Sequence, residues 1–241
     1  PRNPEAYEEF RRGMELQAIP EDWGEAIDHF FRAWALDSTF YSAALMAVIN
    51  TQAAFERGLG DWREERDSVL AYLIRSERRM TRQERYLFNV YTQHRGDTEG
   101  ALRAARDASE IYPREFAYSR GILALALNRV REAVAAFELL EREEGGVREE
   151  YVRNWPLYFE KYADALHRLG EHEKELEVVL EGKHRFPDYP GFVEAELWAR
   201  IGLGQTDLVR SMIIDMRREN GPLSLRFVVQ ELIAQGMDEL A

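Results

Sequence analysis

Gly96-Asp97-Thr98-Glu99-Gly100-Ala101 is a short turn followed by the start of a helix, and related segments recur along the chain. Glycine tolerates a left-handed turn, an Asp can cap the free amides of the next helix, and the small Ala101 allows close helix packing one turn later. The other copies are Glu21-Asp22-Trp23-Gly24-Glu25-Ala26, Gly60-Asp61-Trp62-Arg63-Glu64-Glu65, Asn128-Arg129-Val130-Arg131-Glu132-Ala133, Gly170-Glu171-His172-Glu173-Lys174-Glu175, Gly204-Gln205-Thr206-Asp207-Leu208-Val209 and Gly236-Met237-Asp238-Glu239-Leu240-Ala241.

The copies follow one another at intervals of 32 to 42 residues, counted between their last residues from Ala26 to Ala241. Apolar residues between the copies recur with a helical period, for example Ile27, Phe30, Ala33 and Trp34. A repeat of about 34 residues that contains two helices predicts an all-α array of antiparallel helix pairs. We expect about six repeats and a partial seventh, in one domain over residues 1–241. Because the chain begins at Pro1 and the seventh copy stops at Ala241, we also expect it to be part of a longer protein.

Three copies carry further small residues and prolines at matching positions. They are Gly96, Ala101, Ala108 and Pro113 in the third copy, Gly121, Ala133 and Phe137 in the fourth, and Gly170 and Pro187 in the fifth. This pattern resembles the tetratricopeptide repeat family. The resemblance implies a right-handed α-solenoid whose first helices line a concave, partner-binding face. Glu65 and Glu175 depart from the pattern, because each replaces the usual small residue.

Several local signals predict where helices begin and what they bury. Asn3 before Pro4 is a helix start, and the first helix should carry Tyr7, Phe10 and Met14 on one side. Gly13 and Gly121 fall inside helices, which indicates close approach of a neighbouring helix. Capping boxes are predicted at Asp22-x-x-Glu25, Asp61-x-x-Glu64 and Thr81-x-x-Glu84, and an exposed loop is predicted at 141–150.

The charge and composition exclude several classes of function. The chain has 44 acidic and 32 basic residues and a net charge of -12, so it should repel nucleic acids and anionic lipids. It has no cysteine, which excludes disulfides and thiolate chemistry. The uncharged stretch Ser38–Phe55 holds too many polar side chains for a lipid-exposed span, so we expect a buried helix and no membrane insertion.

No motif in the sequence predicts catalysis. His94-Arg95-Gly96-Asp97 is faintly like a kinase catalytic loop, but it lies in a repeat turn, where Asp97 can cap a helix. His172-Glu173-Lys174-Glu175-Leu176 lacks the second histidine of a zinc-protease helix. The five histidines are scattered. We therefore expect no enzyme activity, no cofactor and no metal ion.

Three phrases resemble the C-terminal repeat regions of bacterial multidomain signalling proteins, notably serine/threonine kinases and related regulators. They are Glu5-Ala6-Tyr7-Glu8-Glu9-Phe10, Ala33-Trp34-Ala35-Leu36-Asp37-Ser38-Thr39-Phe40 and Ala165-Leu166-His167-Arg168-Leu169-Gly170-Glu171-His172. The resemblance implies an interaction module of a larger signalling protein. A peptide-sensing domain of a transcription regulator and a substrate-binding accessory domain of a transferase stay open as alternatives.

The positions that line the concave face in the family can be matched to this sequence. The matched residues are candidates for binding a protein or peptide partner. A mixed aromatic, amide and charged lining would suit an extended peptide or a partner's helix. The chaperone-tail clamp of some family members needs a Lys and Asn pair where this chain has Phe10 and Met14, so such a tail is not expected. The candidates are Asn50, Arg57, Tyr86, Val90, Gln93, Tyr118, Ile122, Asp164 and His167.

Overall fold

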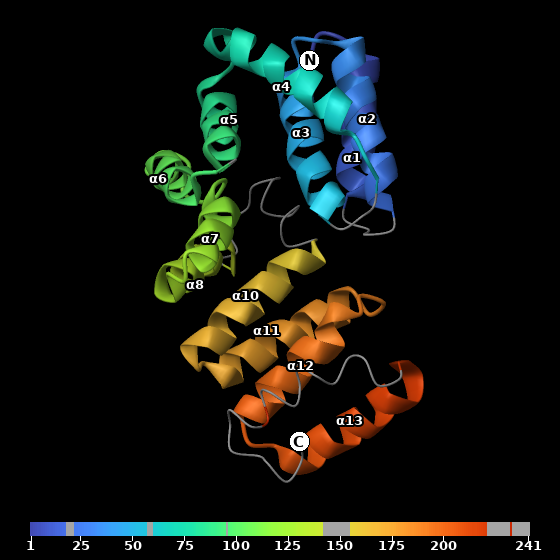
Figure 1. Cartoon of the computed structure of the whole chain (residues 1–241), viewed down its shortest axis with the longest axis vertical. Coiled ribbons are helices and arrows are strands. Elements are labelled where there is room, and N and C mark those ends of the chain that lie inside the picture. The colour runs from blue at the N-terminus through green and yellow to red at the C-terminus, as the bar shows by residue number, and fades with distance from the viewer. Residues whose placement is uncertain (18–21, 57–59, 95, 142–154, 221–231, 233–241) are drawn as a thin grey trace. The chain divides into compact units, whose positions relative to one another are not determined.

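The computed structural model describes residues 1–17, 22–56, 60–94, 96–141, 155–220 and 232. Within these ranges the protein is helical and contains no strand. Consecutive helices form antiparallel pairs, so the predicted all-α class with about six repeats is confirmed (Figure 1). In chain order the helices are α1 (Pro4–Leu16), α2 (Trp23–Leu36), α3 (Tyr41–Glu56), α4 (Arg63–Ser76), the short 3-10 helix η2 (Glu77–Arg79), α5 (Arg82–His94), α6 (Thr98–Ser109), α7 (Ala117–Ala126), α8 (Val130–Glu141), α10 (Pro156–Leu169), α11 (His172–Arg185), α12 (Gly191–Gly202) and α13 (Thr206–Asn220).

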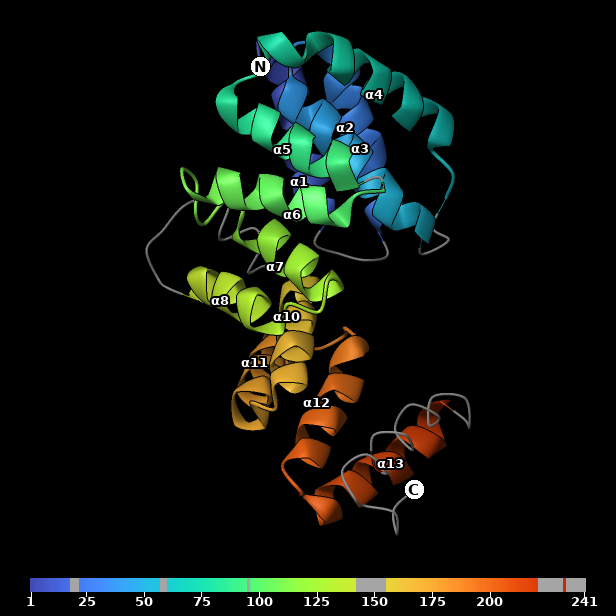
Figure 2. The same ribbon diagram turned by 60° about the vertical axis from the view of Figure 1, so that its left-hand side comes forward.

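The chain forms two compact units. The described part of unit 1 lies within Pro1–Leu123, and that of unit 2 lies within Ala124–Ala241. Figures 1 and 2 show α1, α2 and α3 side by side in unit 1, and α10, α11 and α12 side by side in unit 2. A single repeat domain over 1–241 stays a prediction.

Several of the repeated turns contain a residue with a positive φ angle, and in each case that residue is Gly or Asn. Gly96, Gly170 and Gly204 have φ angles of 135°, 77° and 69°, and Asn128 at the equivalent place has a φ of 56°. Only glycine, and less easily asparagine, adopts such angles at low cost. The positive φ angle at the first residue of these copies therefore explains why that residue is Gly or Asn.

The predicted helix starts are confirmed at some positions and wrong at others. The Asn3 side chain accepts a hydrogen bond from the Glu5 amide, and Thr81 and Glu84 form a reciprocal capping box. The two Asp boxes are wrong: Asp22 makes no side-chain cap, and α4 has Trp62 at its cap position. The Asp61 carboxylate instead binds the backbone amide and guanidinium of Arg63.

The core of unit 1 is built on close contact between helices. Gly13 of α1 lies against the ring of Phe30, and Phe10 packs between Phe30 and Phe40. In the predicted stripe of α2, Ile27, Phe30 and Ala33 are buried and Trp34 is partly buried, but Tyr7 of α1 is 50% exposed. The buried side of α1 passes through Ala6 and Gly13 instead, because Gly13 admits the neighbouring ring and thereby sets the orientation of the helix.

The core of unit 2 is aromatic at its centre. Tyr158, Phe159 and Tyr162 of α10 are buried and contact one another or Phe137 of α8. On the next interface, a side chain at Gly182 of α11 would collide with Phe159 and with Phe192 of α12.

The uncharged stretch of the sequence forms most of α3, which is buried within unit 1 as predicted. No helix in the described ranges is long and apolar enough to cross a membrane. Most of the predicted 141–150 loop, all of the partial seventh repeat, Arg57 and the side chain of Gln93 lie outside what the structure describes.

Candidate functional site

The predicted binding residues of unit 1 belong mainly to the helix packing. Asn50 and Val90 are each 7% exposed, and the Asn50 side-chain amide donates to the Met46 carbonyl at 2.8 Å. The half-buried ring of Tyr86 contacts the rings of Tyr112 and Phe116 at centroid distances of 6.3 and 6.2 Å. Asn50 and Val90 thus offer a partner little surface, and Tyr86 offers only part of its ring.

Tyr118 and Ile122 lie four residues apart on α7 and are both half-buried. Their spacing places them on one side of the helix. They stay candidate binding residues.

In unit 2, the first helices α10 and α12 pack against each other and carry several carboxylates at their junction. Asp164 is partly exposed and is paired with Arg168 one helical turn later, with Nε to Oδ1 at 2.8 Å. Glu160 of α10 lies close enough to Glu194 of α12 for their charges to repel. We call the surface formed by Glu160, Asp164, Glu194 and Trp198 the first-helix face.

Negative charge on the first-helix face is only partly compensated. Glu160 accepts hydrogen bonds from Lys161 at 2.7 Å and from the Tyr189 hydroxyl. Glu194 has no hydrogen bond or ion pair among the described residues. Its pKa is raised above the ordinary 4.5, first by burial and second by the charge of Glu160. Burial and the charge of Glu160 therefore both disfavour the ionised form of Glu194.

The neighbouring carboxylate Glu196 is in the opposite situation. It is 6% exposed and accepts hydrogen bonds from Lys183 at 2.7 Å and from Arg200 at 2.9 and 2.6 Å. Burial alone would raise the pKa of Glu196, but these two cations outweigh it and lower the pKa. Glu196 is a structural ion-pair residue that joins α11 to α12.

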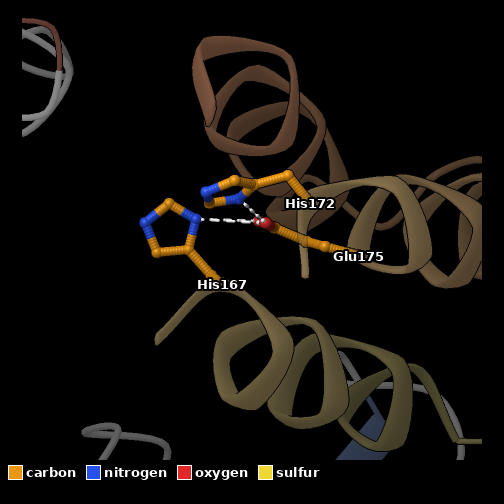
Figure 3. Close-up of side chains that lie close together, drawn as sticks. All are labelled: His167, His172 and Glu175. Atoms are coloured by element: carbon orange, nitrogen blue, oxygen red, sulfur yellow. Dashed lines mark hydrogen bonds and ion pairs between the residues drawn. The ribbon is translucent and has the colours of Figure 1, made fainter. Parts of the chain in front are cut away.

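His167, the last of the predicted candidates, is turned toward a second site. Its Nδ1 lies 3.1 Å from both carboxylate oxygens of Glu175, and the Nδ1 of His172 lies 2.9 Å from Glu175 Oε2 (Figure 3). Glu175 is 1% exposed. Among the described residues, these three form the group whose donor atoms meet closely enough to hold a metal ion. The sequence signal that could have found it is the carboxylate at a repeat position normally held by a small residue.

A small cavity of about 100 Å³ lies between α8, α10 and α11. Its walls include Tyr162 and Val178, and its acidic residues Glu141 and Glu181 are already paired with Lys174 and Arg185. This volume would hold a single side chain and not a peptide.

In the kinase-like phrase, Asp97 lies at a helix start, as predicted, and Arg95 lies outside the described residues. The Asp97 carboxylate accepts a hydrogen bond from the Gly100 amide at 2.7 Å and caps α6. This capping hydrogen bond explains why an aspartate occupies position 97.

No protein-family model and no curated protein matches the sequence. Among solved structures, that of PilF from Pseudomonas aeruginosa aligns over 95% of this chain and 99% of its own, with a TM-score of 0.53 and 18% identity. A tetratricopeptide repeat protein from Parabacteroides merdae aligns over 98% and 89%, with a TM-score of 0.46 and 18% identity. The TPR2AB domain of yeast Sti1 in complex with pHSP90 aligns over 98% and 96%, with a TM-score of 0.36 and 15% identity. The first of these similarities establishes a shared fold, that of a helical repeat protein.

Proposed function

We propose that this protein is a non-catalytic interaction module that binds a basic segment of a partner protein on the first-helix face. The observation that carries the proposal is the uncompensated carboxylate of Glu194 beside Glu160 at the junction of α10 and α12. A folded protein gains no stability from two close carboxylates. A bound cation would remove this repulsion, so the arrangement favours a ligand that supplies positive charge.

The chemistry of the first-helix face suits arginine or lysine side chains in a peptide. Trp198, which lies next to His167 at a ring distance of 5.8 Å, is half-buried and adds an aromatic surface to the carboxylates. Carboxylates bind guanidinium groups in pairs of hydrogen bonds, and indole rings stack on them. Lys161 and Arg168 offset part of the charge, but such exposed ion pairs are weak and a partner can replace them.

The charge of the whole molecule supports the same class of partner. A net charge of -12 accelerates the approach of basic segments and opposes nucleic-acid phosphates and anionic membranes. Binding to a basic peptide should accordingly weaken as salt is added.

The proposal is tested with a fluorescent peptide that alternates arginine and leucine, and a matched peptide with glutamate in place of arginine. Fluorescence anisotropy should detect binding of the arginine peptide only. The double substitution Glu160→Gln and Glu194→Gln should weaken that binding about tenfold, which corresponds to about 1.4 kcal/mol. The double substitution Glu173→Gln and Glu177→Gln is the matched control, because it removes the same two charges from exposed positions on the second helix α11.

Two results would overturn the proposal. One is equal affinity for both peptides, and the other is a loss of affinity in the Glu173→Gln and Glu177→Gln control as large as that in the Glu160→Gln and Glu194→Gln variant. The setting in a larger bacterial signalling protein is proposed only on the three phrases noted above. It is tested by reading the complete gene for an adjoining kinase or cyclase domain.

A further inference from the structure

We propose that His167, His172 and Glu175 bind one Zn²⁺ ion in unit 2, between α10 and α11. The inference goes beyond the proposed binding of a basic segment and departs from the sequence-based expectation of no metal. Two imidazole nitrogens and a carboxylate form a ligand set that zinc sites use, with water in the fourth position. The three side chains come from the end of α10 and the first turn of α11 (Figure 3).

The spacing of the donor atoms is close to that of a tetrahedral site. One donor atom from each residue lies within 4.8 Å of the other two, and the nitrogen-to-oxygen distances are 2.9 and 3.1 Å. Zinc bonds of about 2.1 Å at tetrahedral angles space neighbouring ligands about 3.4 Å apart. Side-chain shifts of a few tenths of an ångström would therefore open room for the ion.

The buried carboxylate of Glu175 is contacted by the two imidazoles and has no Lys or Arg partner among the described residues. Glu175 is 1% exposed, and a buried carboxylate is costly unless positive charge or several hydrogen bonds compensate it. The nearby cations are engaged elsewhere, Arg168 with Asp164 and Lys174 with Glu138. A divalent ion would supply the compensation and leave both imidazoles neutral, as ligation requires. A single imidazolium would supply the same compensation, and the experiment below separates the two.

The surrounding residues hold the ligands in place. A side chain at Gly202 of α12 would lie 2.4 Å from the His172 ring, so this ring position depends on the glycine. The ring of Trp198 packs on His167. Glu175 is the fourth residue of α11, and the fourth residues of the other described second helices are Ala26, Arg66, Ala101, Ala133 and Val209. Arg66, and not Glu65 as the sequence pattern predicted, therefore occupies this position in α4, and among these helices only α11 has a carboxylate there.

The ligand types favour zinc over Ca²⁺, Mg²⁺ and Cu⁺. Nitrogen donors outnumber oxygen donors, which disfavours Ca²⁺ and Mg²⁺. The site has no sulfur ligand of the kind that selects Cu⁺. A bound ion would connect α10 to α11 beside α12 and so stabilise unit 2.

The test uses the untagged 241-residue chain, stripped of metal with a chelator that is then removed. Isothermal titration with ZnCl₂ should give one zinc per chain, and saturating zinc should raise the Tm by roughly 5 °C or more. Co²⁺ in place of zinc should give the intense visible absorption of a tetrahedral site. None of these readouts involves a peptide partner, so failure here leaves the proposed function untouched.

Two variants and a control test the assignment of the ligands. His172→Ala and Glu175→Gln should each weaken zinc binding at least tenfold, since even outer-shell changes commonly cost 10–100-fold. His184→Ala is the matched control, because it removes an exposed histidine from the same helix and should leave binding unchanged. Failure of the folded natural chain to bind zinc would overturn the proposal, and so would zinc binding that depends on His184 and not on His172.

Discussion

Glu194 and Glu196 are two residues apart on α12, yet their environments shift their pKa values in opposite directions. Glu196 is held by Lys183 and Arg200, whereas Glu194 is partly buried beside the like charge of Glu160. This difference follows from helix geometry, because side chains two residues apart on a helix point to different sides. One carboxylate therefore stabilises the fold, and the other places charge on the first-helix face at some cost to stability.

We expect Glu194→Gln to raise the free energy of unfolding at pH 7 by roughly 0.3–1 kcal/mol, the range for partly exposed charges. The folded-state pKa of Glu194 lies above 4.5, so the folded state binds this proton more tightly than the unfolded state. The cost of the ionised form is present at neutral pH and disappears as the pH falls toward 4.5. Urea unfolding of both proteins between pH 7 and pH 4 should show the difference shrinking on acidification. A difference that grows on acidification would contradict the assignment.

We expect the reverse for Glu196→Gln, which should lower the free energy of unfolding at pH 7 by about 1–3 kcal/mol. The folded-state pKa of Glu196 lies below 4.5, so its contribution is present above 4.5 and is lost as the pH falls through the folded-state value. The same urea series measures it. Equal stability of the variant and the natural protein at pH 7 would show that the ion pairs with Lys183 and Arg200 contribute nothing net.

Much of the fold could be predicted from local sequence signals. The turn residues Gly96, Asn128 and Gly170 are required by positive φ angles, and such requirements are visible in sequence. Side-chain orientation was less predictable. Tyr7 has the spacing of a core residue, but the contact between Gly13 and Phe30 turns it outward.

The candidate sites were harder to predict, because they depend on side-chain contacts in the folded structure. Asn50 matches a family binding position, but its amide bonds to the Met46 carbonyl and is buried. The cluster of His167, His172 and Glu175 joins two helices across a turn, and His172 needs the space left by Gly202 of a third helix. The spacing of residues within one helix cannot predict contacts that involve three helices.

Gly13→Ala should destabilise the protein, although alanine is normally the better helix residue. The added carbon would lie 2.8 Å from the Phe30 ring and 3.0 Å from the Ala26 carbonyl oxygen. Overpacking of this kind costs about 1–3 kcal/mol and outweighs the gain of about 1 kcal/mol in helix propensity. Gly24→Ala is the control, because the nearest atom there is at 3.6 Å and belongs to the Trp62 side chain. We expect Gly24→Ala to be neutral or stabilising, and a stabilising Gly13→Ala would show that Phe30 can move aside.

Tyr86→Ala should lower the free energy of unfolding by about 2–3 kcal/mol, because it removes a ring packed against Tyr112 and Phe116. Tyr86→Phe keeps the ring and should cost less than 1 kcal/mol. Arg103→Ala on α6 is the surface control, with a side chain 61% exposed, and should change stability by at most about 0.5 kcal/mol.

Thermal and urea unfolding of these three variants, followed by circular dichroism, would measure the effects. If Tyr86→Ala kept the stability of the natural protein and lost affinity for the arginine peptide, Tyr86 would belong to the partner-binding surface. If it lost stability while a Tyr86→Phe variant still bound the peptide normally, the ring would be a packing element of unit 1. We expect the second result, since Tyr112 and Phe116 already pack against the half-buried ring of Tyr86.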